Sequence, residues 1–154
     1  MNNQKGVRDY VFVGIQAVLF GLYFYYLQFS PLEANLPTIG GLGLAAIGSN
    51  LIVMAILQLR TTLSPFPTPV ADGQLITTGV YSLARHPIYV GVLLMGVGYA
   101  WYAHSSLHYL LTLALAILFY FKSSYEEKLL LSVYPEYAAY RQRVGRFLPW
   151  SFTA

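Results

Sequence analysis

The sequence predicts an all-α integral membrane protein with about four transmembrane helices, followed by a short amphipathic helix on the cytosolic side. Hydrophobic residues make up 56% of its 154 residues and charged residues only 10%, against roughly 25% charged in ordinary soluble domains. Four apolar stretches occur, and the Lys and Arg residues avoid two of the three connections between them. The length suits one domain, which we take as residues 1–154.

The first two apolar stretches, at about residues 10–29 and 39–59, are long enough to cross a bilayer, because a helix needs roughly 20 apolar residues to do so. The first is too long for a signal peptide and has no small-x-small cleavage site, so we expect a retained anchor. The second carries Gly41, Ala45 and Ser49 at intervals of four. Such a stripe of small residues favours close helix packing in lipid.

The last two stretches, at about residues 88–103 and 107–121, are shorter and are joined by a three-residue turn. We expect them to form a helical hairpin, with both spans extended at their cytosolic ends by polar helix. A shallow re-entrant hairpin is the alternative. Pro87 suits the first turn of a helix, where its missing N–H is not needed, so the third helix should begin there with His86 near the cap.

Composition argues against thiol and metal chemistry. Cysteine is absent, which excludes disulfides, thiolate nucleophiles and Cys-bound metals. We interpret His104 and His108 as residues of the loop between the third and fourth stretches, with no third ligand nearby, and expect no metal site. The pI of about 9.1 does not indicate nucleic acid, because the basic residues flank apolar spans, where they set topology.

The positive charges give the expected orientation. They precede the first stretch, separate the second from the third, and follow the fourth. They are Lys5, Arg8, Arg60, Arg85, Lys122, Lys128, Arg141, Arg143 and Arg146. With four spans all of them fall on one side of the membrane, which the positive-inside rule makes the cytosol. We therefore expect a multi-pass protein in the lipid bilayer with both termini cytoplasmic.

The connection between the second and third stretches, residues 60–84, is long and irregular. Its alternating prolines, at positions 65, 67 and 69, forbid helix and favour extended backbone. A loop of this length is usually functional or disordered. Its apolar residues predict that it packs against the rest of the protein. These residues are Leu75, Ile76, Val80 and Tyr81.

Two polar clusters flank the hairpin, and ionisable groups beside a membrane are candidates for function. In the first, RHPIYVG at residues 85–91, a helix N-terminus beside Arg85 suits an anion. In the second, Lys122 and Glu126 are four apart and can pair on one helix face. Glu126 and Glu127 only accept hydrogen bonds, which suits a ribose diol or an amine. The simpler interpretations are an anchor on lipid phosphate and a solvated ion pair.

The segment after the hairpin predicts a short amphipathic helix that Pro135 begins and Gly145 ends. One stripe of this helix combines aromatic and basic side chains, a composition that suits the membrane interface. The stripe consists of Tyr137, Tyr140, Arg141 and Val144. Taken alone, the segment is also compatible with a simple interfacial anchor.

Four elements follow one another between about residues 73 and 150. They are Thr78-Gly79-Val80-Tyr81, RHPIYVG at 85–91, Glu126-Glu127, and YPEYAAYRQRVGRFLP at 134–149. Their order and spacing resemble the isoprenylcysteine carboxyl methyltransferase family and its bacterial and archaeal relatives, a group that includes phospholipid N-methyltransferases. The resemblance covers about half the chain.

The resemblance implies a membrane methyltransferase that uses S-adenosylmethionine, bound on the cytosolic side. Its acceptor would be a small or lipophilic carboxylate, thiol or amine, or a lipidated molecule, reached from the bilayer. By position, the candidate cofactor-binding residues are Tyr81, Arg85, His86, Pro87, Tyr89, Gly91, Glu126, Glu127 and Tyr134. The candidate catalytic residues are Glu126, Lys122 and Arg146, with Glu126 as the base if the acceptor is an amine. Prenylcysteine enzymes have Arg at the position of Lys122, and Lys lacks its bidentate fork.

Two other functions remain open from the sequence. Sterol and steroid reductases, which use NADPH, are similar in their C-terminal layout, although their heptad has Asn where this chain has His86. A non-catalytic lipid-binding protein is the second alternative. The oligomeric state is also open, because the small-residue stripe could serve a dimer as well as the bundle.

Overall fold

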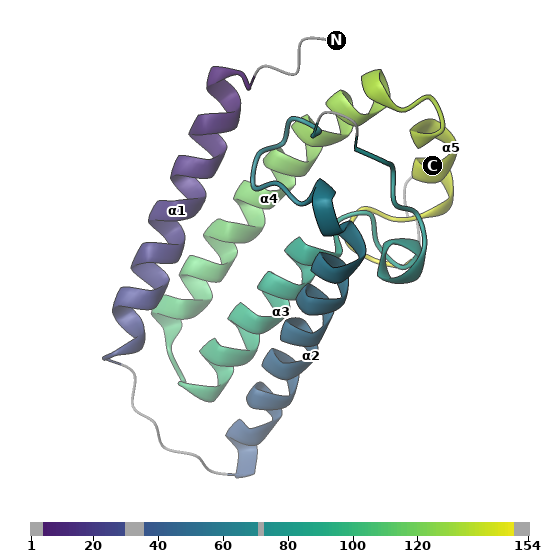
Figure 1. Ribbon diagram of the computed structural model, residues 1–154. Helices are drawn as coiled ribbons and strands as arrows, with labels where there is room; N and C mark the ends of the chain where they lie inside the picture. The colour runs from purple at the N-terminus through teal and green to yellow at the C-terminus, as the bar shows by residue number, and fades with distance from the viewer. Residues whose placement is uncertain (1–4, 30–35, 71–72, 150–154) are drawn as a thin grey trace.

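The computed structural model describes residues 5–29, 36–70 and 73–149, which are helices and loops without a strand (Figure 1). The long helices are α1 (Val7–Leu27), α2 (Leu36–Leu59), α3 (Pro87–Tyr102) and α4 (Ser106–Val133). A short helix, α5 (Tyr137–Arg143), follows them, and the α2–α3 loop contains the 3-10 turns η1 (Arg60–Thr62) and η2 (Gly79–Ser82). The predicted all-α class is confirmed. Both chain termini and residue 150, the end of the predicted signature, lie outside the described residues.

Three of these helices, α1, α2 and α4, are long and apolar enough to cross a membrane. Many of their large apolar side chains are exposed, an arrangement that suits contact with lipid. Helix α3 has 16 residues, which is about 24 Å at 1.5 Å per residue, short of the roughly 30 Å hydrocarbon core. The described residues therefore contain three candidate spans and one shorter apolar helix, where the sequence predicts four spans.

The boundaries of the α3–α4 hairpin follow local rules. Helix α3 begins at Pro87 with His86 as its N-cap, as predicted. Helix α4 continues past its apolar part to Val133, so the expected polar extension of this helix is confirmed. It ends there because Tyr134 precedes Pro135 and is held in an extended conformation, with φ −117° and ψ 103°.

The prediction that His108 is a loop residue is wrong, because this residue lies inside α4 and is buried. The helix begins earlier than expected since Ser105 is its N-cap and accepts a hydrogen bond from the His108 amide. The His108 ring packs edge-on against Tyr23 and Tyr99, with centroid distances of 4.7 and 5.0 Å. His104 is the loop residue, with φ 47°. Within the described ranges, no three His, Cys, Asp or Glu side chains are placed to hold a metal.

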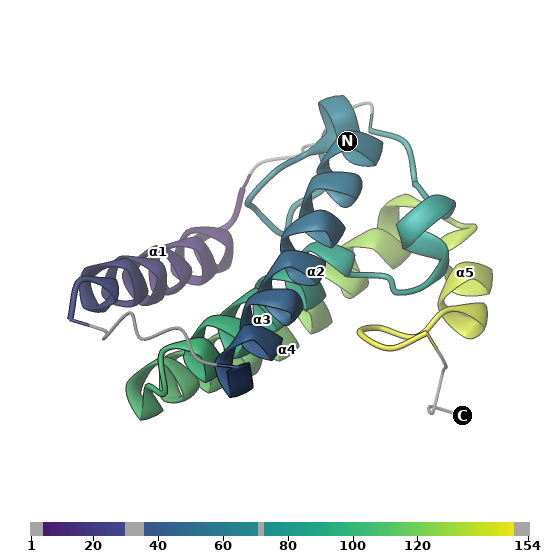
Figure 2. The ribbon, with the colours of Figure 1, turned by 90° about the horizontal axis from the view of Figure 1, so that it is seen from below.

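The small-residue stripe of α2 packs against α3, as predicted. A Cβ atom at Gly41 would lie 2.5 Å from the carbonyl oxygen of Gly98, and one at Gly48 would lie 2.5 Å from that of Gly91. The two backbones therefore touch, a contact that only glycine permits. Helix α1, in contrast, packs on α4 and stands apart from α2 (Figure 2).

The α2–α3 loop packs onto the helices, which confirms the expectation from its apolar residues. Val80 and Tyr81 are buried in a cluster with Ala55 of α2. Gly79 has φ 60°, and a Cβ at this position would collide with the side chain of Gln58, so the turn requires glycine. The Gln58 Oε1 atom accepts a hydrogen bond from the Val80 amide at 3.2 Å, which fixes the loop to α2.

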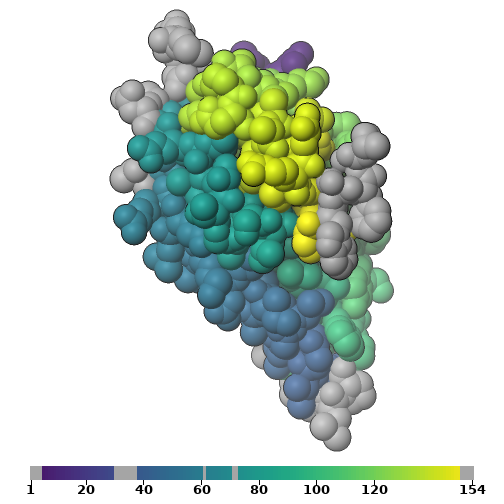
Figure 3. Space-filling model, turned by 90° about the vertical axis from the view of Figure 1, so that its right-hand side faces the viewer, coloured from purple at the N-terminus to yellow at the C-terminus, as the bar shows by residue number. Residues whose placement is uncertain are grey.

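The C-terminal helix α5 is shorter than predicted, and the apolar side of its stripe faces the protein. Tyr137, Tyr140 and Val144 are buried against residues of the loop and of α4. Those neighbours are Leu75, Leu130 and Tyr134. Figure 3 shows the teal loop and the yellow-green C-terminal segment packed together at one end of the molecule. Of the predicted stripe, only Arg141 is exposed.

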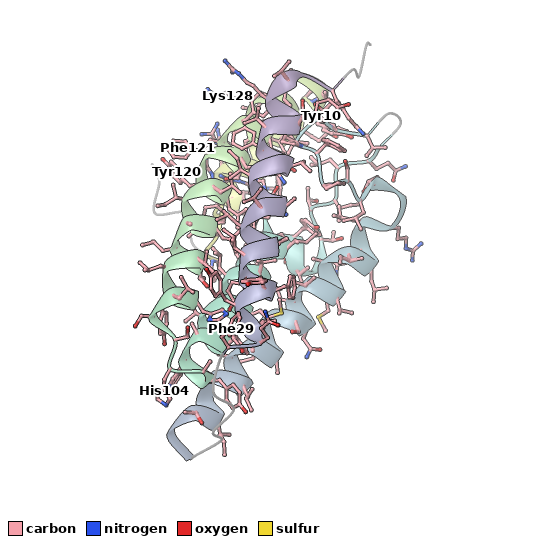
Figure 4. All side chains as sticks on the ribbon, turned by 90° about the vertical axis from the view of Figure 1, so that its left-hand side faces the viewer. Tyr10, Phe29, His104, Tyr120, Phe121 and Lys128 are labelled. Atoms are coloured by element: carbon pink, nitrogen blue, oxygen red, sulfur yellow. The ribbon has the colours of Figure 1, made fainter. Side chains whose placement is uncertain are left out.

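The start of α1, the α2–α3 loop, the end of α4 and α5 meet at one end of the bundle (Figure 1). Tyr10 and Lys128 lie at this end, whereas Phe29 and His104 lie at the other (Figure 4). Most of the polar residues of the candidate site belong to the segments at the first end.

Candidate functional site

The residues before α3 are held by the backbone of the C-terminal segment. The amides of Arg85 and His86 donate hydrogen bonds to the carbonyl oxygens of Gly145 and Arg146, at 3.0 and 3.1 Å. Pro87 has no N–H to satisfy. The RHPIYVG motif and the end of the YPEYAAYRQRVGRFLP segment, which are far apart in sequence, therefore lie side by side.

Glu127 of α4 is the centre of a buried ion cluster. Its Oε1 accepts hydrogen bonds from Arg85 Nε at 3.0 Å, from Arg146 Nε at 3.2 Å and from His86 Nε2 at 3.2 Å. Its Oε2 accepts one from Arg146 Nη2 at 3.1 Å. The Glu127 side chain is 2% exposed, and a carboxylate so buried requires this degree of pairing. These partners engage both oxygens, so Glu127 ties the residues before α3 and the C-terminal segment to α4. Its place in cofactor binding stays a prediction.

Arg85 has a second role in the same cluster. Its Nη1 donates hydrogen bonds to the carbonyl oxygens of Arg141 and Val144, which satisfies two carbonyls at the end of α5. Its other donors go to Glu127. Because these contacts engage the guanidinium, Arg85 mainly links the start of α3 to α4 and to the end of α5.

Glu126 occupies a different environment from its neighbour. Its Oε2 accepts a hydrogen bond from the Tyr89 hydroxyl at 2.9 Å and lies 3.7 Å from His86 Nδ1. Its side chain is 25% exposed and lines a cavity. The described residues provide no hydrogen-bond donor to its Oε1, so this oxygen can accept a hydrogen bond from a ligand.

Lys122 does not pair with Glu126, so the expected ion pair between them is wrong. Lys122 is 1% exposed, and its ammonium donates to Gln16 Oε1 of α1 at 2.6 Å and to the Pro65 carbonyl at 2.8 Å. It also lies 5.6 Å from the centre of the Tyr89 ring, within cation–π range. The solvated interpretation of this cluster also fails, because Lys122 is buried.

A column of stacked rings carries Tyr89. The rings of His86 and Tyr89 are parallel within 2°, with centroids 5.3 Å apart. Tyr89 stacks in turn on Phe119 of α4, at 4.5 Å and 11°. Phe119 is fully buried, so this column fixes the position of the Tyr89 hydroxyl, and with it that of Glu126.

These residues surround a cavity of about 370 Å³. Most of the sequence-predicted site residues line it, namely Tyr81, Arg85, His86, Pro87, Tyr89, Lys122, Glu126 and Tyr134. Glu127 and Arg146 belong to the ion cluster and are not among the residues that line the cavity. Gly91 lies where α3 meets α2, and a Cβ there would lie 2.6 Å from Ile52 Cγ1. Its place in cofactor binding stays a prediction.

Sequence reasoning missed two parts of the cavity wall. Residues 63–70 of the α2–α3 loop form one side, and Gln16 of α1 contributes an amide. Gln16 did carry a signal, because an amide inside an apolar span is costly in lipid. Tyr137 also lines the cavity, although its position in the stripe predicted contact with the membrane interface.

Buried tyrosines at the loop side of the cavity remain neutral donors at physiological pH. Burial raises the pKa of Tyr140 to about 12, although Arg85 opposes this shift. Burial, together with the charge of Glu126, also raises the pKa of Tyr81. The Tyr140 hydroxyl donates to the Tyr81 carbonyl, and that of Tyr134 donates to the Gly73 carbonyl at 2.8 Å. The phenols therefore join the loop to α5 and the end of α4.

A second, apolar cavity of about 350 Å³ lies between α1, α3 and α4. Its lining residues are Phe20, Tyr23, Phe24, Leu27, Val92, Met95, Gly96, Tyr99 and Leu115. Each helix contributes to both cavities from the same face, since the residues concerned are three, four or seven positions apart. The pairs are Tyr89 with Val92, Gln16 with Phe20, and Lys122 with Leu115. The apolar cavity therefore follows the polar one along the same helix faces, as a separate cavity with different lining residues.

Comparison with known proteins agrees with this arrangement. The chain is 38% identical over 80 residues to the cobalt-zinc-cadmium resistance protein CzcN of Cupriavidus metallidurans. The match covers 51% of this chain and 37% of that protein, so the chain spans little more than a third of its relative's length. The family model described as phospholipid methyltransferase matches residues 36–137, more than half of the chain. The match includes the RHPIYVG motif and the Glu126-Glu127 pair, and the chain therefore belongs to the phospholipid methyltransferase family of membrane methyltransferases.

Proposed function

We propose that the protein transfers a methyl group from S-adenosylmethionine to a lipophilic acceptor that enters from the bilayer. One observation carries the proposal: the RHPIYVG motif and the polar end of α4 form walls of a single cavity, joined by the bond between Tyr89 and Glu126. The positive charges near this end of the bundle support a cytosolic position for the cavity.

The residues present fit the cofactor. A volume of about 370 Å³ lies within the range of small-molecule sites, about 300–1,000 Å³. Glu126 would accept from the ribose hydroxyls or the amino group, and Lys122 would face the carboxylate. Tyr89, whose ring stacks between His86 and Phe119, would face the ligand with its edge and hydroxyl group. Tyrosines at the loop end, Tyr81 and Tyr134 among them, suit the adenine.

The bound cofactor supplies an electrophilic methyl group: the acceptor's lone pair forms the new bond to carbon, while sulfur keeps the electron pair of the broken bond. The protein's contribution is to hold the reactants in line and to exclude water. For an amine or thiol acceptor, Glu126 would take the proton. Glu127 and Arg146 keep the surrounding residues in position.

The apolar cavity supports a lipophilic acceptor. A hydrocarbon chain lying between α1, α3 and α4 would contact Phe20, Val92 and Leu115. Because the two cavities follow one another along the same helix faces, its polar end would lie near Lys122 and Glu126. The acceptor atom, whether oxygen, sulfur or nitrogen, is a matter for substrate screening.

The test is calorimetric binding of S-adenosylmethionine and S-adenosylhomocysteine to the detergent-purified protein. We expect micromolar binding, weakened at least tenfold by Glu126→Gln, because the amide loses the charge that faces the ligand. Glu136→Gln, which changes an exposed carboxylate outside the cavity, is the matched control. A folded protein that binds neither compound contradicts the proposal, and NADPH would then be tested as the ligand of a reductase.

A further inference from the structure

One wall of the polar cavity, residues 63–70, is attached to the start of α1 by a buried carboxylate. The Oδ1 atom of Asp9 accepts hydrogen bonds from the backbone amide of Thr68 at 2.9 Å and from its hydroxyl at 2.8 Å. Its Oδ2 accepts one from the Gly6 amide at 2.7 Å. Asp9 is 0% exposed. Its charge is balanced by these donors and by the N-terminal end of α1.

Two further contacts join the same wall to its neighbours. Phe66 packs edge-on against Tyr10 of α1 at 5.4 Å, and the Lys5 ammonium lies 3.9 Å above its ring. Next to it, the Pro65 carbonyl accepts from Lys122, which also binds Gln16 of α1. The wall is therefore attached to both α1 and α4. Figures 1 and 2 show the α2–α3 loop passing near the start of α1.

Few backbone N–H groups are available to hold this segment. Its prolines at positions 65, 67 and 69 carry no N–H, so they cannot donate to neighbouring backbone. The amide of Thr68 goes to Asp9, and that of Phe66 goes to the hydroxyl of Ser64 within the segment. A segment with few backbone hydrogen bonds opens easily unless its side chains are held. The hydrogen bonds from Thr68 to Asp9 therefore contribute to keeping this wall closed.

We propose that the start of α1 is a latch for residues 63–70 and that Asp9 is its positioning residue. By holding Thr68, Asp9 keeps the segment over the cavity and slows the exchange of the bound cofactor. Asp9 itself does not line the cavity, so its removal leaves Glu126, Tyr89 and His86 in place. This inference rests on the proposed function for the identity of the ligand, but the latch itself can be measured without ligand.

The experiment compares Asp9→Ala, Thr68→Val and the double variant in the full chain, purified in detergent. Limited proteolysis, with the cut sites mapped by mass spectrometry, reports opening of residues 63–70 without ligand. Chase of labelled S-adenosylmethionine gives its dissociation rate. We expect both rates to rise by more than tenfold in Asp9→Ala, because it removes both hydrogen bonds from Thr68 and the loss of one hydrogen bond to a charged group corresponds to about tenfold. Thr68→Val should give a smaller rise, because its amide still donates.

The double variant should resemble Asp9→Ala alone, because both changes remove the same interaction. Thr68→Ser, which keeps the hydroxyl, and Glu136→Gln, an exposed acidic residue, should behave as the wild type. If the Asp9→Ala and Thr68→Val variants are cut by protease and release cofactor at wild-type rates, the proposed latch is wrong. The proposed function is not affected by that result. If the folded wild type binds no S-adenosylmethionine, the proposed function and the exchange role both fail, and proteolysis still decides whether Asp9 holds the segment.

Discussion

Arg85 and Glu127, 42 positions apart, form a salt bridge in which the Nη2–Oε1 distance is 2.9 Å and both side chains are buried. The bridge joins the residues before α3 to the polar end of α4. The next carboxylate, Glu126, faces the cavity. The two adjacent glutamates therefore differ in their surroundings. Glu127 forms buried ion pairs that hold the site together, whereas Glu126 faces the cavity.

The two glutamates should differ when they are mutated. Glu127→Ala leaves Arg85 without its buried partner, and breaking a buried pair in this way costs about 3–5 kcal/mol. Glu126→Gln keeps the hydrogen bond from Tyr89 and should leave the thermal unfolding midpoint almost unchanged, while cofactor binding weakens. Thermal unfolding and calorimetry in the same detergent measure both effects. Equal loss of stability in the two variants would contradict the division of tasks.

Alkaline pH should destabilise the contact between the loop and α5. The folded-state pKa of Tyr140 is about 12, above the ordinary value near 10. As pH rises, the unfolded chain loses this proton first, so the contribution is complete below pH 10 and is lost as pH approaches 12. Tyr140→Phe should reduce this pH dependence and, by removing the bond to the Tyr81 carbonyl, cost about 1 kcal/mol. Unfolding midpoints measured between pH 9 and pH 12 would reveal both effects, and an unchanged pH profile would count against this assignment.

Filling the apolar cavity should affect the acceptor and not the cofactor. Val92→Trp places a large ring among the lining residues of this cavity, so turnover of long-chain acceptors should fall by tenfold or more. S-adenosylmethionine affinity should stay within about twofold. Val97→Trp, on an exposed side of the same helix, is the control. A parallel loss of turnover with short and long acceptors would show that the cavity does not hold the chain.

The contact between α2 and α3 should tolerate no side chain at its centre. A Cβ at Gly48 would lie 2.5 Å from the Gly91 carbonyl oxygen and 2.7 Å from the Met95 amide nitrogen. Gly48→Ala must push the helices apart and should cost about 1–3 kcal/mol. Gly43→Ala, on the same helix but in open space, should be neutral or slightly stabilising. The two unfolding midpoints, measured side by side, test this packing directly.

The sequence predicted the elements that depend on local rules. Pro87 and His86 start α3 because proline belongs in the first turn of a helix, and the α2 stripe packs because small residues recur at helical spacing. The helix spacing also suggested that Lys122 and Glu126 pair. That prediction failed because Gln16, 106 positions away, and the carbonyl of Pro65 take the ammonium. Contacts between residues so far apart depend on how whole helices pack. The spacing of residues within one helix carries no information about that packing.

The candidate site, too, could be predicted only where local sequence patterns determine it. The motif identified Glu126, Glu127 and Gly91 together, but a motif does not separate residues that face a ligand from residues that hold them. The structure places Glu126 on the cavity, Glu127 in the ion cluster and Gly91 in the contact with α2. Asp9 was not recognised at all, because its partner Thr68 lies 59 positions away in a loop with no regular pattern.

The bonds from Arg85 to the carbonyls at the end of α5 also set the order in which the site can assemble during synthesis. Arg85 and Val144 are 59 positions apart. At roughly 5–20 residues per second, the ribosome reaches the second residue about 3–12 s after the first. Helices α3 and α4 are synthesised during that interval, while the guanidinium still lacks those carbonyls. The newly made chain therefore cannot complete these hydrogen bonds until residue 144 has been added, and a chain shortened to end before that residue would lack them.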